Sequence, residues 1–164
     1  NGAALINDIS GGTLDEKMFE TIAMLQVPYI LMHMKGTPQN MQKNPIYKSV
    51  THELISFFAD KIHQLHVLKV NDVLIDVGFG FGKAPAHNFE LLKNLALFKN
   101  IEVPILIGVS RKSMLYKTLD ISAQEALNAT TSANTIALLN GANILRVHDV
   151  KEAVEAVKIV AQIR

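Results

Sequence analysis

The sequence predicts an α/β fold built on a parallel sheet. Five short apolar runs alternate along the chain with five longer segments in which apolar residues recur at helical spacing. The runs are apolar throughout and do not alternate with polar residues, which is typical of parallel strands covered by helices. Two architectures fit this pattern, a doubly wound open sheet and a (β/α)8 barrel.

The first two units begin the chain. An apolar run over 3–8 predicts a strand, and the spacing that follows predicts a helix over 15–25, capped by the aspartate at its start. A second buried strand is expected over 27–33. The segment 34–47 is rich in glycine, proline and asparagine, which indicates a loop. The apolar face that follows predicts a long helix over roughly 48–69.

The third and fourth units repeat this order. The run VLID predicts a strand over 73–76, and the segment NFELLKNLALFK predicts a helix over 88–99. The run VPILIG predicts the fourth strand over 103–108. A helix is then expected over 123–142, with Gly141 as its C-cap.

The last unit pairs a strand over 143–149 with an amphipathic helix over 150–163. Asp149 is the expected N-cap of this helix. The sequence has no linker, low-complexity tract or heptad array. We therefore expect residues 1–164 to belong to a single domain.

Composition narrows the class of protein. Apolar residues make up 49% of the chain and charged residues 19%, which argues against disorder. The formal net charge of +1 gives no field that would attract nucleic acid or an anionic membrane, and no apolar run is long enough to span a bilayer. Cysteine is absent, which excludes disulfides and thiolate metal sites. We expect a soluble cytoplasmic protein with neither nucleic acid nor membrane among its partners.

Each predicted strand ends in polar groups that could serve a ligand. In α/β folds ligands bind at the C-terminal ends of the strands, and parallel strands bring these ends to one edge of the sheet. This convergence is the strongest evidence for a site that rests on the residues alone. The groups are Asn7 and Asp8, Met32 and His33, Asp76 with the glycines after it, Gly108 with Ser110 to Ser113, and Arg146 with His148 and Asp149.

Several of these residues also have a purely structural interpretation. Asp8 is expected to cap the turn before a pair of glycines, and Ser110 could cap a short helix beginning at the next residue. Met32 and His33 are more typical of core packing than of a metal site, because no second histidine or acid stands at ligand spacing. A cluster of basic residues beside helix N-termini nevertheless favours an anion site, formed by Arg111, Lys112, Arg146 and His148.

The segment IDVGFGFGKAP carries the most unusual pattern. Its glycines, Gly78, Gly80 and Gly82, match neither a P-loop nor the dinucleotide-binding spacing, but they allow positive φ and a close backbone approach to a flat group. One of the two intervening phenylalanines is expected in the core and the other in the site. Asp76 ends a buried strand, so its carboxylate needs donors, and the N–H edge of a guanine-like or pterin-like ring would supply two.

Five stretches form a joint pattern over nearly the whole chain. They are INDISGG (6–12), LMHMKGTP (31–38), DVGFGFGK (76–83), GVSRKS (108–113) and RVHDV (146–150). In this order they resemble the dihydropteroate synthase family of folate biosynthesis. One departure is Val77, where the family usually has a proline that would stiffen the turn. We therefore expect altered rigidity there and unaltered chemistry.

The resemblance implies a (β/α)8 TIM barrel, of which this chain would form five βα units, an incomplete barrel from about strand four to helix eight. It implies a transferase, the target of sulfonamides, in which p-aminobenzoate displaces diphosphate from 6-hydroxymethyl-7,8-dihydropterin diphosphate to give 7,8-dihydropteroate. Asp76 and Lys112 match the residues nearest the chemistry. The other substrate-binding matches are Asn7, Ile9 and Met32 for the pterin, Gly80, Phe81 and Ser113 for p-aminobenzoate, Arg146 and His148 for diphosphate, and Gly108.

The resemblance also implies features that this chain alone would lack. A complete barrel has eight strands and roughly 250 residues, and the part expected to be missing would carry an asparagine that helps to bind Mg²⁺ and diphosphate. The implied cofactor is thus Mg²⁺, with no metal ligand expected among the residues present. The helices of the last three units would form a homodimer surface. The chain by itself is expected to have little or no synthase activity.

Three other interpretations stay open. A barrel of the methyltetrahydrofolate methyltransferase type would share the contacts of Asn7 and Asp76 with the pterin but lack the SRKS stretch and the anchors at Arg146 and His148. An inactive module would retain part of the pterin and diphosphate site without turnover. A phosphosugar-type barrel would use the anion site alone and leave Asp76 unexplained.

Overall fold

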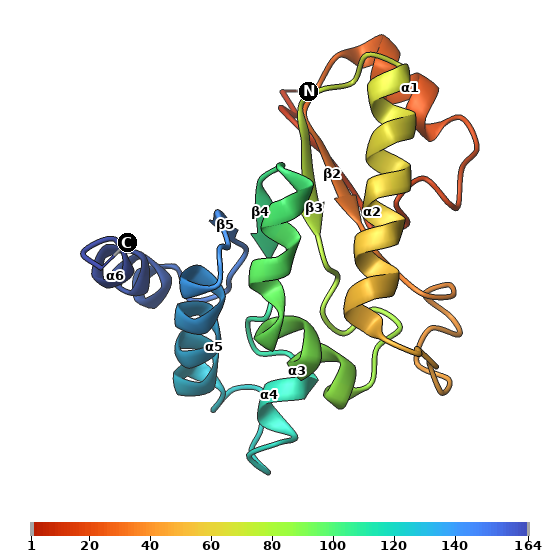
Figure 1. Cartoon of the computed structure of the whole chain (residues 1–164). Coiled ribbons are helices and arrows are strands. Elements are labelled where there is room, and N and C mark those ends of the chain that lie inside the picture. The colour runs from red at the N-terminus through yellow and green to blue at the C-terminus, as the bar shows by residue number, and fades with distance from the viewer. Residues whose placement is uncertain (1, 164) are drawn as a thin grey trace.

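The computed structural model describes residues 2–163. Its centre is one parallel sheet whose strands stand side by side in the order of the sequence (Figure 1). A doubly wound sheet reverses its strand order part-way. The described strands show no reversal, which is the progression of a (β/α)8 barrel, so the predicted α/β class and the barrel alternative are confirmed. The strands are β1 (Ile6–Asp8), β2 (Tyr29–Met32), β3 (Val73–Asp76), β4 (Ile105–Ile107) and β5 (Ile144–Leu145).

The register places the polar strand ends next to each other. Met32, the last residue of β2, pairs with Asp76, the last residue of β3. Leu106 of β4 pairs with Asp76 on the other side, and Ile107 pairs with Leu145 of β5. The carboxyl ends of β2 to β5 therefore meet along one rim.

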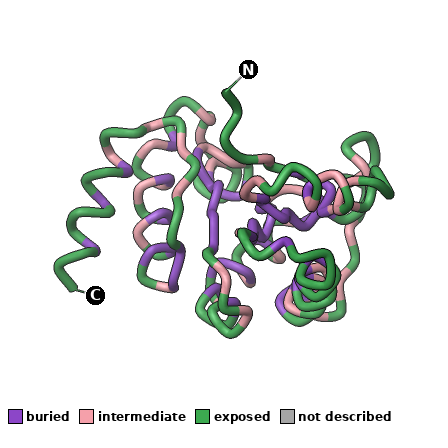
Figure 2. Tube along the Cα trace, turned by 90° about the horizontal axis from the view of Figure 1, so that it is seen from above, coloured by how far each residue is buried: buried purple, intermediate pink, exposed green. Residues whose placement is uncertain are grey.

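Helices follow every strand. Figure 1 shows α2 and α3 in front of one face of the sheet, and α5 lies beside α6 at its end. Seen from above, buried positions follow the strands and the inner sides of the helices, whereas the outer turns are exposed (Figure 2). The helices are α1 (Met18–Leu25), α2 (Val50–Val67), α3 (Pro85–Lys93), the 3₁₀ helix η1 (Leu95–Ile101), α4 (Ser113–Tyr116), α5 (Leu127–Leu139) and α6 (Val150–Val160).

The main core lies between the sheet and α2 and α3. Leu54, Phe58 and Leu65 are fully buried on one side of α2, as their helical spacing predicts. Phe58 meets the ring of Phe98 edge to face, with centroids 6.1 Å apart. Ile75 of β3 packs into the same cluster. This packing fixes the sheet behind the strand ends.

Two helix boundaries differ from the prediction. α1 begins at Met18 with Lys17 as its N-cap residue, and Asp15 instead accepts the N–H of Lys17 in the preceding turn at 2.9 Å. The helix predicted over 88–99 begins earlier, at Pro85. Proline suits the first helical turn because its φ is already helical and because an N–H at that position would have no partner within the helix.

Two helices are also shorter than predicted. α3 ends at Lys93, and the chain continues as the 3₁₀ helix η1. The helix predicted over 123–142 occupies only Leu127–Leu139. Gly141 follows it with φ of +111°, so this glycine does adopt a positive φ just beyond the helix.

The two outer strands have one neighbour each within residues 2–163. β1 pairs only with β2, and β5 only with β4. Edge strands with unpaired backbone groups favour association with further strands. Among the helices of residues 2–163, none combines the length and apolarity needed to cross a membrane.

Candidate functional site

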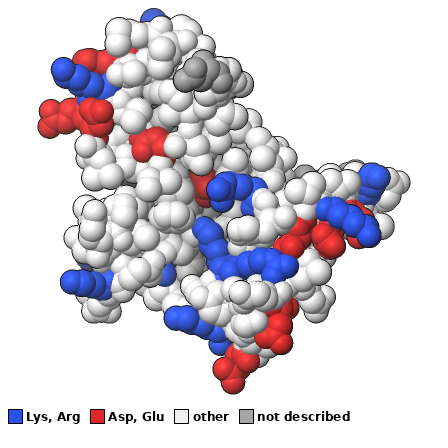
Figure 3. Space-filling view, turned by 180° about the vertical axis from the view of Figure 1, so that it is seen from behind, with Lys and Arg blue, Asp and Glu red and all other residues white. Residues whose placement is uncertain are grey.

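The face opposite the helices carries the candidate site. Figure 3 shows Lys and Arg side chains gathered near the middle of this face around a small patch of acidic atoms. The rim is formed by the carboxyl ends of the parallel strands, where the sequence predicts it.

At the end of β1, Asp8 organises a tight turn. Its Oδ1 accepts the N–H and the hydroxyl of Ser10 at 2.8 and 2.7 Å, and its Oδ2 accepts the N–H of Gly12 and the hydroxyl of Tyr29, both at 2.7 Å. Burial would raise the pKa of Asp8, but these four hydrogen bonds outweigh it and hold the pKa below its usual value. The predicted capping role of Asp8 is thus confirmed.

Two predicted site residues next to this turn are exposed to solvent. Asn7 and Ile9 flank Asp8 and are both exposed, Ile9 at 36% of its surface. They stand at the end of β1, two strands away from Asp76. Met32, the predicted pocket wall on β2, lies between these strands and is 3% exposed.

Asp76 is buried at the rim, with 7% of its surface exposed. Its Oδ1 accepts the N–H of Gly78 at 2.7 Å. Burial raises the pKa of Asp76, and the Gly78 amide and the charges of Lys112, Lys83 and Arg146 act in the opposite direction. One carboxylate is therefore surrounded by three cationic side chains.

The glycine loop after β3 lies against the neighbouring loop. A Cβ at Gly78 would stand 2.1 Å from the carbonyl oxygen of His33, and one at Gly82 would stand 2.3 Å from that of Lys35. Gly80 differs, because the nearest atom, Cδ of Lys112, would be 3.6 Å away. Two glycines thus permit loop packing, whereas Gly80 borders the site.

The two phenylalanines of this loop have different environments. Phe79 is fully buried in the core, and Phe81 is half-buried. The prediction that only one of them belongs to the core is confirmed. The ammonium of Lys112 lies over the ring of Phe81, 4.8 Å from its centroid.

Lys112 occupies the centre of the rim. Its ammonium donates to the carbonyl of Phe79, lies over the ring of Phe81 and interacts electrostatically with the carboxylate of Asp76. Burial lowers the pKa of Lys112 to about 8, an effect that Asp76 opposes and Arg146 reinforces.

Lys83 is a residue of this site that the sequence did not single out. Its side chain is buried, and its ammonium donates to the carbonyls of Gly78, Phe81 and His33 at 3.0 to 3.1 Å. Burial lowers its pKa to about 7, Asp76 opposes this shift and Lys112 adds to it. A lysine directly after three alternating glycines was a usable signal, because such a loop leaves many carbonyls without secondary-structure partners.

The predicted anion cluster is smaller than expected. Arg111 forms a bidentate ion pair with Asp149, with Nε to Oδ2 at 2.9 Å and a terminal nitrogen to Oδ1 at 2.8 Å, and also binds the carbonyl of Ala123. Including Arg111 in the anion cluster was therefore wrong. Asp149 is the N-cap residue of α6, as predicted, but its side chain makes no cap hydrogen bond because Arg111 occupies the carboxylate.

Ser110 does not cap a helix either. α4 begins three residues later, at Ser113, and the hydroxyl of Ser110 lies 2.9 Å from Nδ1 of His148. It also accepts the N–H of His148 at 3.2 Å. Ser110 thus holds His148, which is exposed together with Arg146 and Ser113.

Gly108 stands beside Arg146. It is buried at the end of β4, and a Cβ there would stand 3.9 Å from the Cβ of Arg146. The structure thus gathers most of the predicted site residues on the loops after β3, β4 and β5. The list is Asp76, Gly80, Phe81, Gly108, Lys112, Ser113, Arg146 and His148, with Lys83 as an addition.

Residues 1–148 match the family model described as "Pterin binding enzyme". The chain belongs to the family of pterin-binding enzymes. It is 42% identical over 163 residues to dihydropteroate synthase of Escherichia coli (strain K12), covering 97% of this chain and 57% of that protein. The resemblance to dihydropteroate synthases is confirmed.

Solved structures of pterin-binding enzymes agree. Yersinia pestis dihydropteroate synthase in a sulfonamide complex superposes with a TM-score of 0.93 at 42% identity, covering 99% of this chain and 60% of that one. The enzyme from Xanthomonas albilineans with 4-aminobenzoic acid gives a TM-score of 0.89 at 32% identity, covering 99% and 58%. The chain thus spans about three fifths of the length of these relatives, and its fold is an incomplete barrel of their type.

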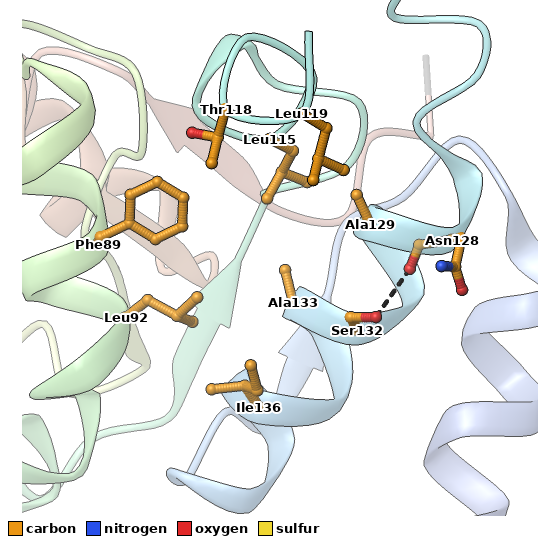
Figure 4. Close-up of a pocket in the computed structure, with 10 residues that line it drawn as sticks. All are labelled: Phe89, Leu92, Leu115, Thr118, Leu119, Asn128, Ala129, Ser132, Ala133 and Ile136. Carbon is orange, nitrogen blue, oxygen red and sulfur yellow. Dashed lines mark hydrogen bonds between the residues drawn. The ribbon is translucent and has the colours of Figure 1, made fainter. Parts of the chain in front are cut away.

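A second hollow lies away from the strand ends. An apolar pocket of about 310 Å³ opens among α3, α4 and α5 (Figure 4). Its lining contains no charged side chain and so offers nothing to a phosphorylated ligand. It consists of Phe89, Leu92, Leu115, Thr118, Leu119, Asn128, Ala129, Ser132, Ala133 and Ile136.

The residues present do not fit a resident metal ion. Residues 2–163 contain no group of three or more His, Cys, Asp or Glu side chains that could hold one. Of the carboxylates at the rim, Asp8 is engaged by four hydrogen bonds, Asp149 by Arg111, and Asp76 by the Gly78 amide and the charges of three cationic side chains. No step proposed below passes through a metal.

Proposed function

We propose that this chain carries the substrate-binding rim of a dihydropteroate synthase. The observation that supports it best is the buried carboxylate of Asp76 among Lys83, Lys112 and Arg146, next to the half-buried ring of Phe81. A carboxylate so placed can accept two N–H groups of a flat heterocycle, while cations beyond it hold an anionic tail. Pterin diphosphate combines these two features in one molecule.

The reaction would be a transfer of the pterin-methyl group. The amine nitrogen of p-aminobenzoate forms a bond to the exocyclic methylene carbon, and the bond from that carbon to the diphosphate oxygen breaks. Diphosphate leaves with the electron pair, and the amine loses a proton to solvent. The structures of relatives with 4-aminobenzoic acid and with 7,8-dihydropteroate support this choice of substrate and product.

On the pterin side, Asp76 and Asn7 would accept and donate hydrogen bonds at the ring edge. Met32 and Ile9 would form apolar walls of the pocket. Lys112 would stand between the two substrates, because its ammonium already lies over Phe81 and near Asp76.

On the other sides of the site, Gly80, Phe81 and Ser113 would contact p-aminobenzoate. Arg146 and His148 would hold the diphosphate, with the buried Gly108 next to Arg146. Charge on the leaving group grows as the C–O bond lengthens, so fixed cations stabilise the transition state more than the ground state. Asp76 would favour an electron-poor pterin ring in the same way, and no general base is required.

Several broader features belong to this proposal. Residues 1–164 would form part of one barrel domain in a cytoplasmic enzyme. The homodimer would use the helices of the last three units, where the apolar pocket among α3, α4 and α5 offers an uncharged surface. Mg²⁺ would take its ligands from the diphosphate and from outside residues 2–163. The chain alone would turn over slowly, because five strands do not close a barrel that needs eight.

Calorimetric titration of the chain with a pterin, with and without diphosphate, tests the proposal. Asp76→Asn keeps the shape of the side chain and removes its charge, so pterin affinity should fall by at least about tenfold. Glu125→Gln changes an exposed carboxylate that accepts hydrogen bonds from Ser122 and serves as the control. If neither wild type nor variant binds pterin, or if both bind it equally, the recognition of the ring by Asp76 is wrong.

A further inference from the structure

We propose that Lys83 is a positioning residue whose buried ammonium sets the glycine loop, and through it the p-aminobenzoate side of the site. This inference rests on the proposed function for the identity of the ligand. It does not require Lys83 to touch either substrate.

The glycine loop is held by side chains at each of its carbonyls. Between Gly78 and Gly82 the backbone forms neither helix nor strand, so its polar groups need other partners. Five successive carbonyls each accept a side-chain donor. The pairs are Gly78 with Lys83, Phe79 with Lys112, Gly80 with Gln42, Phe81 with Lys83, and Gly82 with Tyr47.

Lys83 is the only one of these donors that binds two of the loop carbonyls, at positions 78 and 81. Because these positions are three residues apart, one ammonium fixes the curvature of the whole loop. The N–H of Phe81 also donates to the Gly78 carbonyl at 3.0 Å. The turn from Gly78 to Phe81 is therefore stabilised by a backbone hydrogen bond as well as by the Lys83 ammonium.

The same ammonium ties the loop to β2. It donates to the carbonyl of His33 at 3.1 Å and lies 3.1 Å from Nδ1 of that ring. Burial and nearby lysines lower the pKa of His33 to about 3, so the ring is neutral at neutral pH. The ammonium carries three hydrogens, which the carbonyls of His33, Gly78 and Phe81 accept, so Nδ1 of His33 is a close polar neighbour of an already satisfied ammonium.

The loop set in this way presents the groups proposed for p-aminobenzoate. Lys83 binds the carbonyls of Gly78 and Phe81, and Gly80 lies between these two residues in the sequence. The carbonyl of Phe79, in the same turn, holds Lys112. The position of the Asp76 carboxylate depends less on the loop, because the loop contributes only one hydrogen bond to it, from the N–H of Gly78. Loss of the Lys83 ammonium should therefore disturb the p-aminobenzoate side more than the pterin side.

The test compares wild type, Lys83→Met and Lys35→Met. Methionine keeps the apolar stem of lysine and removes its donor. Lys35 is the matched control, a lysine of the adjacent loop whose ammonium binds the carbonyl of Ile46 and the carboxylate of Glu53. Amide resonances and hydrogen exchange are recorded for the 164-residue chain labelled with ¹⁵N at glycine and phenylalanine. Calorimetry then measures the affinity for a pterin, and for p-aminobenzoate with that pterin bound.

In Lys83→Met we expect the amides of Gly80 and Phe81 to shift and to exchange at least about tenfold faster, a change absent from Lys35→Met. The affinity for p-aminobenzoate should fall by at least about tenfold and that for the pterin by less than about threefold. Unchanged loop amides, or equal losses for both ligands, would overturn the proposal.

Two further outcomes are decisive. If Lys83→Met does not fold, Lys83→Gln, which keeps two donor hydrogens, is measured in the same way. If that variant does not fold either, Lys83 supports the whole fold and the proposed positioning role is wrong. If wild type binds no pterin, the proposed function fails, and the loop amides of the variants still decide the role of Lys83.

Discussion

Two glycines of one loop should respond differently to the same substitution. Gly78 and Gly80 have φ of +65° and +80°, so alanine at either position is strained by about 1–2 kcal/mol. They differ in the space around a new Cβ. At Gly78 it would stand 2.1 Å from the backbone oxygen of His33, whereas at Gly80 the nearest atom is the flexible Lys112 side chain at 3.6 Å.

The clash adds a second cost at Gly78 only. The oxygen of His33 belongs to the backbone beside β2 and also accepts the Lys83 ammonium, so it cannot move aside freely. Overpacking of this kind costs a further ~1–3 kcal/mol. We expect Gly78→Ala to lose about 2–5 kcal/mol of unfolding free energy and Gly80→Ala only about 1–2 kcal/mol.

Urea denaturation followed by circular dichroism measures the difference. With a slope of about 2 kcal/mol/M, the midpoint for Gly78→Ala should lie roughly 1–2.5 M below wild type, and that for Gly80→Ala roughly 0.5–1 M below it. Equal losses in the two variants would refute the reasoning, because only the contact with His33 separates them. A Gly78→Ala midpoint equal to that of wild type would show that the loop does not lie against His33.

The remaining predictions concern charges. Tyr29→Phe removes one of the donors to Asp8 and should cost about 1–2 kcal/mol in urea denaturation at neutral pH. Because the folded pKa of Asp8 is lowered, this stabilisation exists above its unfolded value and disappears as pH falls through the folded pKa, so the cost should shrink in acid. Arg146→Met should weaken diphosphate binding by at least about tenfold in calorimetry, whereas Arg111→Met, which breaks the ion pair with Asp149, should leave it unchanged. The Cε resonance of Lys83 should titrate near 7. Between that value and about 10 the unfolded chain binds more protons, so this residue makes unfolding free energy rise with pH, a slope that Lys83→Met should abolish.

The residues alone were sufficient for the existence of five buried strands and for the strand-end carboxylate, whereas the resemblance to a known family was needed to choose between two strand orders. Continuous apolar runs and their alternation with helical periodicity depend on local spacing, which the chain displays directly. Asp76 could be found because an acid after a buried run is costly without partners. Asp8 could be assigned to a turn because two glycines follow it at close range.

The errors at the site arose from contacts between distant positions. Arg111 and Asp149 are 38 residues apart, and the ion pair between them was predicted for neither residue. Ser110 and His148 are separated by the same distance in sequence. Local propensity favours a serine or aspartate as a helix cap, but a partner across the rim competes for the same oxygen, and the fold alone decides which one is near.

The charge balance at the rim connects these observations. Three cationic side chains, Lys83, Lys112 and Arg146, act on the single buried carboxylate of Asp76, which leaves positive charge in excess. Burial lowers the pKa of both lysines, to about 7 and about 8, so the excess positive charge at the rim is electrostatically costly. A ligand with an anionic tail would relieve this cost, raise both lysine pKa values and take up protons on binding. Binding of pterin with diphosphate near pH 8 should therefore raise the pH of a weakly buffered solution, whereas a pterin without diphosphate should do so much less.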